Sequence, residues 1–445
     1  MFGAWPNTGL MEVSAVGGDP RRVTRLDATY EGNYHAQPEF IGDSDVILFN
    51  AFNAFTAVGV PSVMVSGPQN PERLLLEDGG TNPRYAPSGH LLLAKNGSLM
   101  AAAFDPDSLD QTAAAVPVLQ GIMTLGNRTA QYATAEDGTL AYIAGESRAV
   151  EHTLVRVDRD GGSVALTDTQ RAYWGPRFSP DGERLLFWLS GDDPQVWVLE
   201  VARGSLTRLT SEKASFWPIW TPGGDEVAFS HRQEEGQVKV FRKDVAGGRG
   251  QEQLTSNALD DQASAWSSDG RLLVFQKGID PVTGFDIWVH DLDQQASHAL
   301  LNTGANEFHP TLSADGEWLA YVSDESGRRE VYVARFPEMT QRTAISVDGG
   351  SEPVWNPRGG ELFFRKDDRM MVVEFSAGPN PRAGRSRILF EGRFVPGTPY
   401  GRNYDISPDG QSFVMITSTE MSSPPSQVHV ILNWFEELER LVPTP

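Results

Sequence analysis

Residues 178–189 read FSPDGERLLFWL, and this stretch decides the fold because it recurs as WSSDGRLLVFQ at 266–276 and as LSADGEWLAYV at 312–322. With degenerate relatives such as YAPSG at 85–89 and ISPDG at 406–410, the phrase occurs nine times, at intervals of 42 to 51 residues. A repeat in the forties that carries short strands is typical of a β-propeller blade.

The unit around residues 174–210 shows how one blade is read. GPRFS at 175–179 predicts a short inner strand, PDG predicts a tight turn, and RLLFWL at 184–189 predicts an apolar central strand. QVWVLEV at 195–201 alternates as a third strand, and LTRLT at 206–210 predicts the outer edge. The sequence therefore predicts an all-β propeller of four-stranded blades, with about eight or nine blades.

The two ends of the chain bear on how the propeller closes. The last repeat has no fourth strand of its own, so we expect an N-terminal strand, Arg21–Arg25, to complete the last blade. The even spacing favours a single ring over residues 1–445. The alternative is a split near 121–129 into a partial and a complete propeller. Residues 434–442 have a helical stripe of Trp434, Leu438, Leu441 and Val442, which predicts a short C-terminal helix.

Composition narrows the classes of partner. The 445 residues include 37 Lys and Arg against 59 Asp and Glu, a net charge of −22, which repels nucleic-acid phosphates and anionic lipid. There is no cysteine, which excludes disulfides, thiolate metal sites and cysteine nucleophiles. No stretch approaches the length of a membrane-spanning helix, and the first residues lack the pattern of a signal peptide.

The repeat resembles a known family. The SPDG turn with its following edge strand is similar to the TolB-type propeller repeat. DIWVHDL at 286–292, SDESGRREVYVARFP at 323–337, SEPVWNPRGGELFFR at 351–365 and VILNWFEELERLVP at 430–443 resemble the propeller region C-terminal to many bacterial serine/threonine protein kinases. The resemblance implies a ligand-sensing or protein-docking module, often periplasmic. The kinase catalytic motifs are missing, so no phosphoryl transfer is expected.

The turn aspartates form the first candidate site. Asp181, Asp269, Asp315 and Asp409 recur at the same place in the repeat, which could suggest a ring of metal-binding or acid–base carboxylates. Aspartate at this position commonly accepts a hydrogen bond from the turn backbone, and we favour that structural role. The eight histidines are scattered singly. We therefore expect no metal and no cofactor, although a site that converges only in space stays open.

The segments that enter the inner strands form the second candidate site. They carry aromatic and hydrogen-bonding side chains, which are typical anchors of binding surfaces, and in this parsing they gather at one mouth of the channel. The candidate residues are His35, Tyr173, Trp174, Phe216, Trp217, Gln262, His309 and Glu352. The alternative for each aromatic residue is that it packs between neighbouring blades.

Three functions remain open from the sequence. The leading hypothesis is a non-catalytic module that binds a protein, peptide or glycan at the channel mouth. The resemblance implies a link to a kinase or envelope complex. The rival is a propeller enzyme, a lactonase, lyase or hydrolase, whose groups converge in the channel from several blades. The third is a purely structural assembly module.

Overall fold

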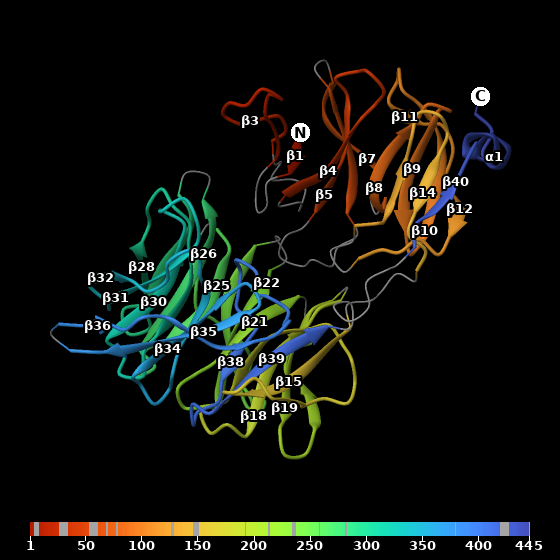
Figure 1. Ribbon diagram of the computed structural model, residues 1–445. Coiled ribbons are helices and arrows are strands. Elements are labelled where there is room, and N and C mark those ends of the chain that lie inside the picture. Colours follow the sequence, from red (N-terminus) through yellow and green to blue (C-terminus); the bar gives the residue numbers. More distant parts are fainter. Residues whose placement is uncertain are drawn as a thin grey trace. The chain divides into compact units, whose positions relative to one another are not determined.

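The computed structural model describes residues 1–3, 9–25, 34–52, 61–67, 70–76, 79–125, 129–145, 151–191, 193–211, 214–233, 237–257, 259–280, 283–378, 380–418 and 427–444. The chain forms two compact units (Figure 1). The first comprises Met1–Val150 with Ser423–Pro445, and the second comprises Glu151–Ser422. Nearly all regular structure is β-strand, which confirms the predicted all-β class. The described residues contain no helix with the length and hydropathy needed to cross a bilayer.

The second unit, Glu151–Ser422, is built from six antiparallel sheets in the part of the chain that the structure describes. The first sheet contains β17 (Tyr173–Phe178), β18 (Arg184–Leu189), β19 (Gln195–Glu200) and β20 (Ser205–Arg208), and the second contains β21 (Ser215–Trp220), β22 (Glu226–Arg232), β23 (Val238–Asp244) and β24 (Glu252–Gln253). The third sheet contains β25 (Asp261–Trp266), β26 (Leu272–Asp280), β27 (Gly284–Asp291) and β28 (Ala296–Leu301), and the fourth contains β29 (Glu307–Leu312), β30 (Trp318–Ser323), β31 (Glu330–Arg335) and β32 (Thr340–Ala344). The fifth sheet contains β33 (Ser351–Trp355), β34 (Glu361–Lys366), β35 (Arg369–Ser376), β36 (Arg382–Ala383) and β37 (Arg387–Glu391), and the sixth contains β16 (Ser163–Ala165), β15 (His152–Asp158), β39 (Ser412–Ser418) and β38 (Asp405–Ile406).

The sixth sheet closes this unit into a ring. β15, at the start of the unit, pairs along its whole length with β39, at the end, from His152 opposite Ser418 to Asp158 opposite Ser412. Figure 1 shows these two strands side by side although they lie far apart in the sequence. Closure by strands from both ends of a ring removes two open sheet edges.

The predicted closure by Arg21–Arg25 is therefore wrong. Arg21–Arg22 forms β3, which pairs with β2 (Leu10–Glu12) in the first unit. The physical reason is an exchange of third strands. β15 and β16 follow β13 (Tyr132–Thr134) and β14 (Leu140–Tyr142) in sequence but complete the last blade of the ring, whereas β40 (His429–Ile431) completes the sheet of β13 and β14. The two compact units divide after Val150, whereas the sequence favoured a single ring and placed its alternative split near 121–129, of which residues 126–128 lie outside the described residues.

Apolar side chains fill the spaces between neighbouring sheets of the ring. One buried cluster joins the fifth sheet to the sixth through residues such as Phe363 and Phe413, whose rings lie 5.1 Å apart. Another joins the sixth to the first through Leu154, Val414 and Leu185. Further buried clusters join the second sheet to the third and the third to the fourth, so the core of the ring lies between neighbouring sheets.

The inner strands share a bulge that determines where their side chains point. In β17, β21, β29 and β33 the pairing register shifts at a residue followed by proline, and that residue has positive φ: Gly175 (58°), Trp217 (50°), His309 (55°) and Glu352 (55°). A bulge re-aims a side chain, and positive φ at a non-glycine residue is costly. The ring therefore holds Trp217, His309 and Glu352 in unusual backbone conformations at matching positions.

The first unit contains four further sheets among the described residues. They are β1 (Phe2–Gly3), β2 and β3; β4 (Tyr34–Phe40), β5 (Ile47–Phe52), β6 (Ser62–Gly67) and β7 (Asn70–Leu76); β8 (Thr81–Ala86), β9 (His90–Lys95), β10 (Ser98–Asp105), β11 (Asp110–Gln111) and β12 (Val116–Gln120); and β13, β14 and β40. The predicted C-terminal helix is α1 (Trp434–Leu441), which buries Trp434 and Leu438 against the sheets of this unit.

Candidate functional site

The turn aspartates have the structural role that the sequence favoured. Asp181 Oδ1 accepts the backbone N–H of Glu183 at 2.9 Å, and Asp269 Oδ1 accepts that of Arg271 at 3.0 Å. Asp315 and Asp409 repeat the arrangement. Hydrogen bonds from the neighbouring serine hydroxyls hold the pKa of Asp181 and Asp269 below the usual range. These carboxylates stabilise turns in the ring.

Three of the predicted mouth residues meet around one segment of the same chain, residues 396–404, which we call the plug segment. Glu352 accepts the backbone N–H of Gly397 at 2.9 Å and that of Asn403 at 2.8 Å. His309 Nε2 lies 2.6 Å from the carbonyl oxygen of Thr398, so this nitrogen carries the proton and donates it. Burial lowers the pKa of His309 to about 3, which keeps the imidazole neutral.

The plug segment also contacts the other sheets of the ring. Gln276 Nε2 donates to the carbonyl oxygen of Pro399 at 2.9 Å, and Asn403 Oδ1 accepts the N–H of Gly175 at 3.0 Å. A Cβ added to Gly401 would lie 2.3 Å from the Trp217 ring, so only glycine allows the backbone to approach this closely. The plug segment thus contacts five of the six sheets of the ring. Trp217, His309 and Glu352, which were predicted to face a ligand, contact this segment of the same chain instead.

The remaining predicted site residues do not join this group. Tyr173 and Phe216 are fully buried, and Trp174 is half-buried against Trp188 at 6.0 Å between ring centroids, as the packing alternative expected. Gln262 is buried, and its Oε1 has no hydrogen-bond partner among the described residues. His35 lies in the first unit rather than on the ring, because β4 belongs to that unit. There its Nδ1 lies 2.7 Å from the Thr24 hydroxyl.

The opposite ends of the inner strands surround a cavity of about 430 Å³, which we call the turn-end cavity. Its wall contains the last residue of every inner strand. These residues are Phe178, Trp220, Trp266, Leu312, Trp355 and Ile406. The volume falls within the range of small-molecule and peptide-side-chain pockets. The sequence prediction missed this cavity because it followed the aromatic residues at the strand entrances, whereas the Trp that ends three of the six inner strands was the available signal.

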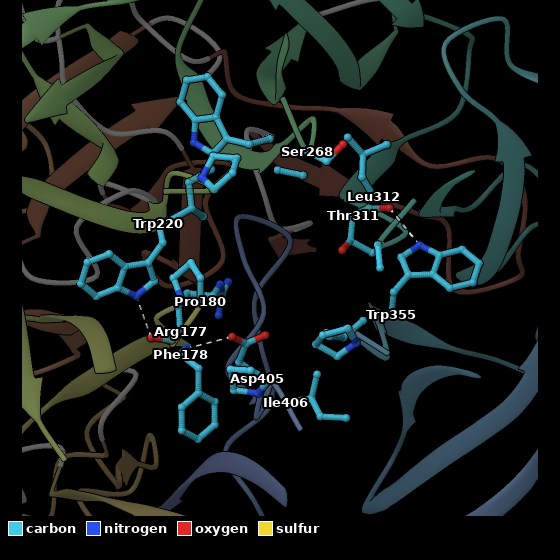
Figure 2. Close-up of a pocket in the computed structure, with 18 of the residues that line it drawn as sticks. Arg177, Phe178, Pro180, Trp220, Ser268, Thr311, Leu312, Trp355, Asp405 and Ile406 are labelled. Carbon is cyan, nitrogen blue, oxygen red and sulfur yellow. Dashed lines mark hydrogen bonds between the residues drawn. The ribbon is translucent and has the colours of Figure 1, made fainter. Parts of the chain in front are cut away.

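Hydrogen bonds hold two of the three tryptophans of the turn-end cavity. Trp220 Nε1 donates to the carbonyl oxygen of Arg177 at 3.2 Å, and Trp355 Nε1 donates to that of Thr311 at 3.2 Å (Figure 2). Each indole therefore ties its inner strand to the preceding one. Figure 2 shows Trp220 and Trp355 on two sides of the cavity, with Arg177 and Asp405 between them. Fixed aromatic walls of this kind bind a partner at small entropic cost.

The charged groups of the turn-end cavity are few. Arg177, Arg402 and Asp405 line it, together with hydroxyl groups that include those of Ser264, Ser268 and Thr311. Asp405 Oδ2 accepts the N–H of Phe178 at 3.0 Å. No histidine is among the lining residues, and the described residues contain no group of three His, Cys, Asp or Glu side chains arranged to hold a metal ion. The cavity offers aromatic, hydroxyl and guanidinium groups for binding.

Comparison with known proteins identifies the repeat. A family model described as the TolB beta propeller domain, PD40, matches residues 131–280. An uncharacterized peptidase of Bacillus subtilis is 24% identical over 184 residues, which is 39% of this chain and 26% of that protein. A TolB homolog of Chlorobium chlorochromatii is 31% identical over 139 residues, which is 31% of this chain and 30% of that protein. The chain thus spans about a third or less of the length of these two relatives.

A solved structure agrees with the fold. A putative TolB from Agrobacterium tumefaciens has a TM-score of 0.52 with 22% identity, and the match covers 61% of this chain and 99% of that one. At this level of identity the likeness concerns the fold alone. Together with the ring of antiparallel sheets, the family match leads to one conclusion: the chain carries a TolB-like β-propeller.

Proposed function

We propose that this protein is a non-catalytic binding module that receives a peptide segment of a partner protein in the turn-end cavity of the Glu151–Ser422 ring. The observation that carries the proposal is the lining itself: side chains from all six sheets, among them three indoles and several hydroxyls, converge around about 430 Å³. Amphipathic aromatic anchors surrounded by hydrogen-bonding groups are typical of protein recognition sites.

The opposite end of the ring supports a peptide as the occupant. There the inner strands already bind an extended piece of polypeptide, the plug segment, through backbone N–H and carbonyl groups. The plug segment also supplies Arg402 to the wall of the turn-end cavity, and Asp405 and Ile406 follow it. A peptide entering from the turn side would therefore end against peptide backbone that the ring holds in place.

The enzyme alternative receives less support from the lining. General acid–base chemistry uses a pair of titratable groups placed within reach of a substrate. The described lining has one carboxylate, Asp405, and it already accepts a backbone N–H and faces Arg402. The lining therefore favours binding over catalysis.

A sensory role linked to a kinase or an envelope complex in the periplasm is the finer form of this proposal. It rests on the resemblance of segments such as 286–292 and 351–365 to propeller regions that follow bacterial serine/threonine kinases. Cross-linking in intact cells followed by mass spectrometry tests it. Recovery of a kinase or an envelope protein at residues of the turn-end cavity supports it, and recovery of other classes only contradicts it.

The binding proposal is tested by selecting random displayed peptides on the intact protein and measuring the affinity of synthetic copies by fluorescence anisotropy. Ser268 is exposed and lines the turn-end cavity, so Ser268→Trp fills the entrance without disturbing the core. Ser205, exposed on the outer strand β20, gives the matched control Ser205→Trp. We expect selected peptides to lose binding to Ser268→Trp only. Equal binding to both variants, or no selected peptide, contradicts the proposal.

A further inference from the structure

The turn-end cavity contains more positive than negative charge. Arg177 comes from β17 and Arg402 from the plug segment, and Asp405 is the one carboxylate among the described lining residues. The local balance is +1, from two guanidiniums and one carboxylate, in a chain whose net charge is −22. This excess lies in a buried place, since Arg177 is only 8% exposed and the Arg402 side chain 13%.

The hydrogen bonds of Arg177 go to neutral groups only, and the negative charges of Asp405 and Glu352 act on it from a distance. Its Nη1 lies within hydrogen-bond distance of the carbonyl oxygens of Pro176 at 2.7 Å, Arg402 at 3.2 Å and Tyr404 at 3.4 Å. These acceptors are neutral. Its Nε is buried and has no hydrogen-bond partner in the structure. A buried guanidinium that meets only carbonyl groups carries a desolvation cost that an anion would relieve.

Arg402 is paired only in part. Its Nη2 lies 3.6 Å from Asp405 Oδ1, which is longer than a hydrogen bond, and its Nε is also buried without a hydrogen-bond partner. The Asp405 carboxylate makes this contact through Oδ1 and accepts the N–H of Phe178 through Oδ2. Glu352, which also acts on Arg177, already accepts two backbone N–H groups of the plug segment and is not among the lining residues.

The pKa of Arg177 agrees with this geometry. Burial, followed by the neighbouring positive charge of Arg402, lowers the pKa of Arg177 to about 9. The positive charges of the two guanidiniums therefore repel each other. An anion placed between them would remove that repulsion.

We propose that the ligand of the turn-end cavity carries a carboxylate that binds between Arg177 and Arg402, so that the recognised peptide presents an acidic residue flanked by groups that pack on Trp220 and Trp355. This inference rests on the proposed function and names the chemistry of its ligand. The net charge of −22 disfavours non-specific binding of an acidic peptide, whereas the local charge of the cavity attracts its carboxylate.

The test uses small anions on the intact protein, so that it does not depend on any peptide. Glutarate and inorganic phosphate are titrated separately by ligand-observed NMR at constant ionic strength, and the dissociation constants are compared among variants. Arg402→Gln removes one guanidinium that holds a single long ion pair. Asp405→Asn removes the competing carboxylate but keeps an oxygen for the N–H of Phe178. Arg203→Gln, on an exposed turn of the ring, is the charge-matched control.

We expect wild type and Arg203→Gln to bind glutarate with the same affinity. Arg402→Gln should bind it at least about tenfold more weakly, because one charge-assisted hydrogen bond is lost. Asp405→Asn should bind several times more tightly than wild type. Tighter binding of phosphate than glutarate would assign a phosphoryl group instead and overturn the carboxylate. Absence of anion binding in both wild type and Asp405→Asn also overturns it, and peptides that still bind would then leave the proposed function intact.

Discussion

The contact between Gly401 and the Trp217 ring gives a sharp test of the plug segment. In Gly401→Ala, the new Cβ would lie 2.3 and 2.4 Å from ring carbons Cε3 and Cζ3 of Trp217, well inside van der Waals contact. The ring cannot retreat freely, because Trp217 is only 4% exposed and packs edge-on against Trp188 at 5.4 Å, while a Cβ on Gly175 would lie 3.2 Å from it. Overpacking of this kind costs about 1–3 kcal/mol.

That cost should appear as local opening of the plug segment. A loss of about 1–3 kcal/mol raises the population of the open form about 5- to 150-fold, and hydrogen exchange of the N–H groups of Gly397 and Asn403 should accelerate by the same factor. Hydrogen–deuterium exchange with mass spectrometry over 396–404 measures it. Exchange in the central strands β26 and β30 should stay at the wild-type rate.

Two variants control this measurement. Gly191→Ala places the same methyl group in an exposed loop where no atom lies within 4 Å of the new Cβ, and it should leave exchange unchanged. Trp217→Leu in the Gly401→Ala background removes the clashing ring and should restore part of the protection. Wild-type exchange over 396–404 in Gly401→Ala would refute the close packing of the segment against Trp217.

Three further predictions concern other parts of the chain. Glu352→Gln replaces one acceptor oxygen with an amide group that faces a backbone N–H. The free energy of opening of the plug segment should therefore fall by about 1–3 kcal/mol, which accelerates its hydrogen exchange. Burial raises the pKa of Glu307 from 4.5 to about 7, so its contribution to stability is complete below pH 4.5 and is lost as the pH rises through 7. In urea titrations, the free energy of unfolding of wild type should therefore fall relative to that of Glu307→Gln between pH 4.5 and 7, and the same pH dependence in both proteins would contradict this prediction. Leu438→Ala in α1 should destabilise the first unit by about 2–5 kcal/mol because Leu438 is fully buried, whereas Leu441→Ala, at a position 40% exposed, should be nearly neutral in thermal unfolding; equal effects would contradict the packing of the helix.

The sequence predicted the individual blade well because its signals are local. The strands expected at 175–179, 184–189, 195–201 and 206–210 are β17 to β20 within a few residues, and the aspartates stabilise turns as expected. Turn chemistry and strand alternation depend on neighbours in the chain, so they can be read without knowledge of the fold.

Closure of the ring could not be predicted in the same way. His152–Asp158 and His429–Ile431 both have the pattern of a third strand, and either could complete either blade. The choice between them depends on packing between strands more than two hundred residues apart, which periodicity does not report. For the same reason the ring and the first unit divide after Val150, where the chain shows no break in the repeat.

The predicted site residues and the turn-end cavity lie at opposite ends of the inner strands. Trp217, His309 and Glu352 do converge, but the segment 396–404 satisfies them, and nothing in its sequence marks it as a part of the ring interior. The turn-end cavity is lined by the residues just before the turns, which were not among the predicted site residues. Two of them, Trp220 and Trp355, also tie neighbouring strands together.

A crystal structure of the intact protein with a selected acidic peptide tests the central claim most directly. We predict the peptide in the turn-end cavity, with a carboxylate between Arg177 and Arg402 and side chains packed on Trp220 and Trp355. A peptide bound at the plug segment, on the outer strands of the ring or in the first unit, with the turn-end cavity unchanged, would contradict it.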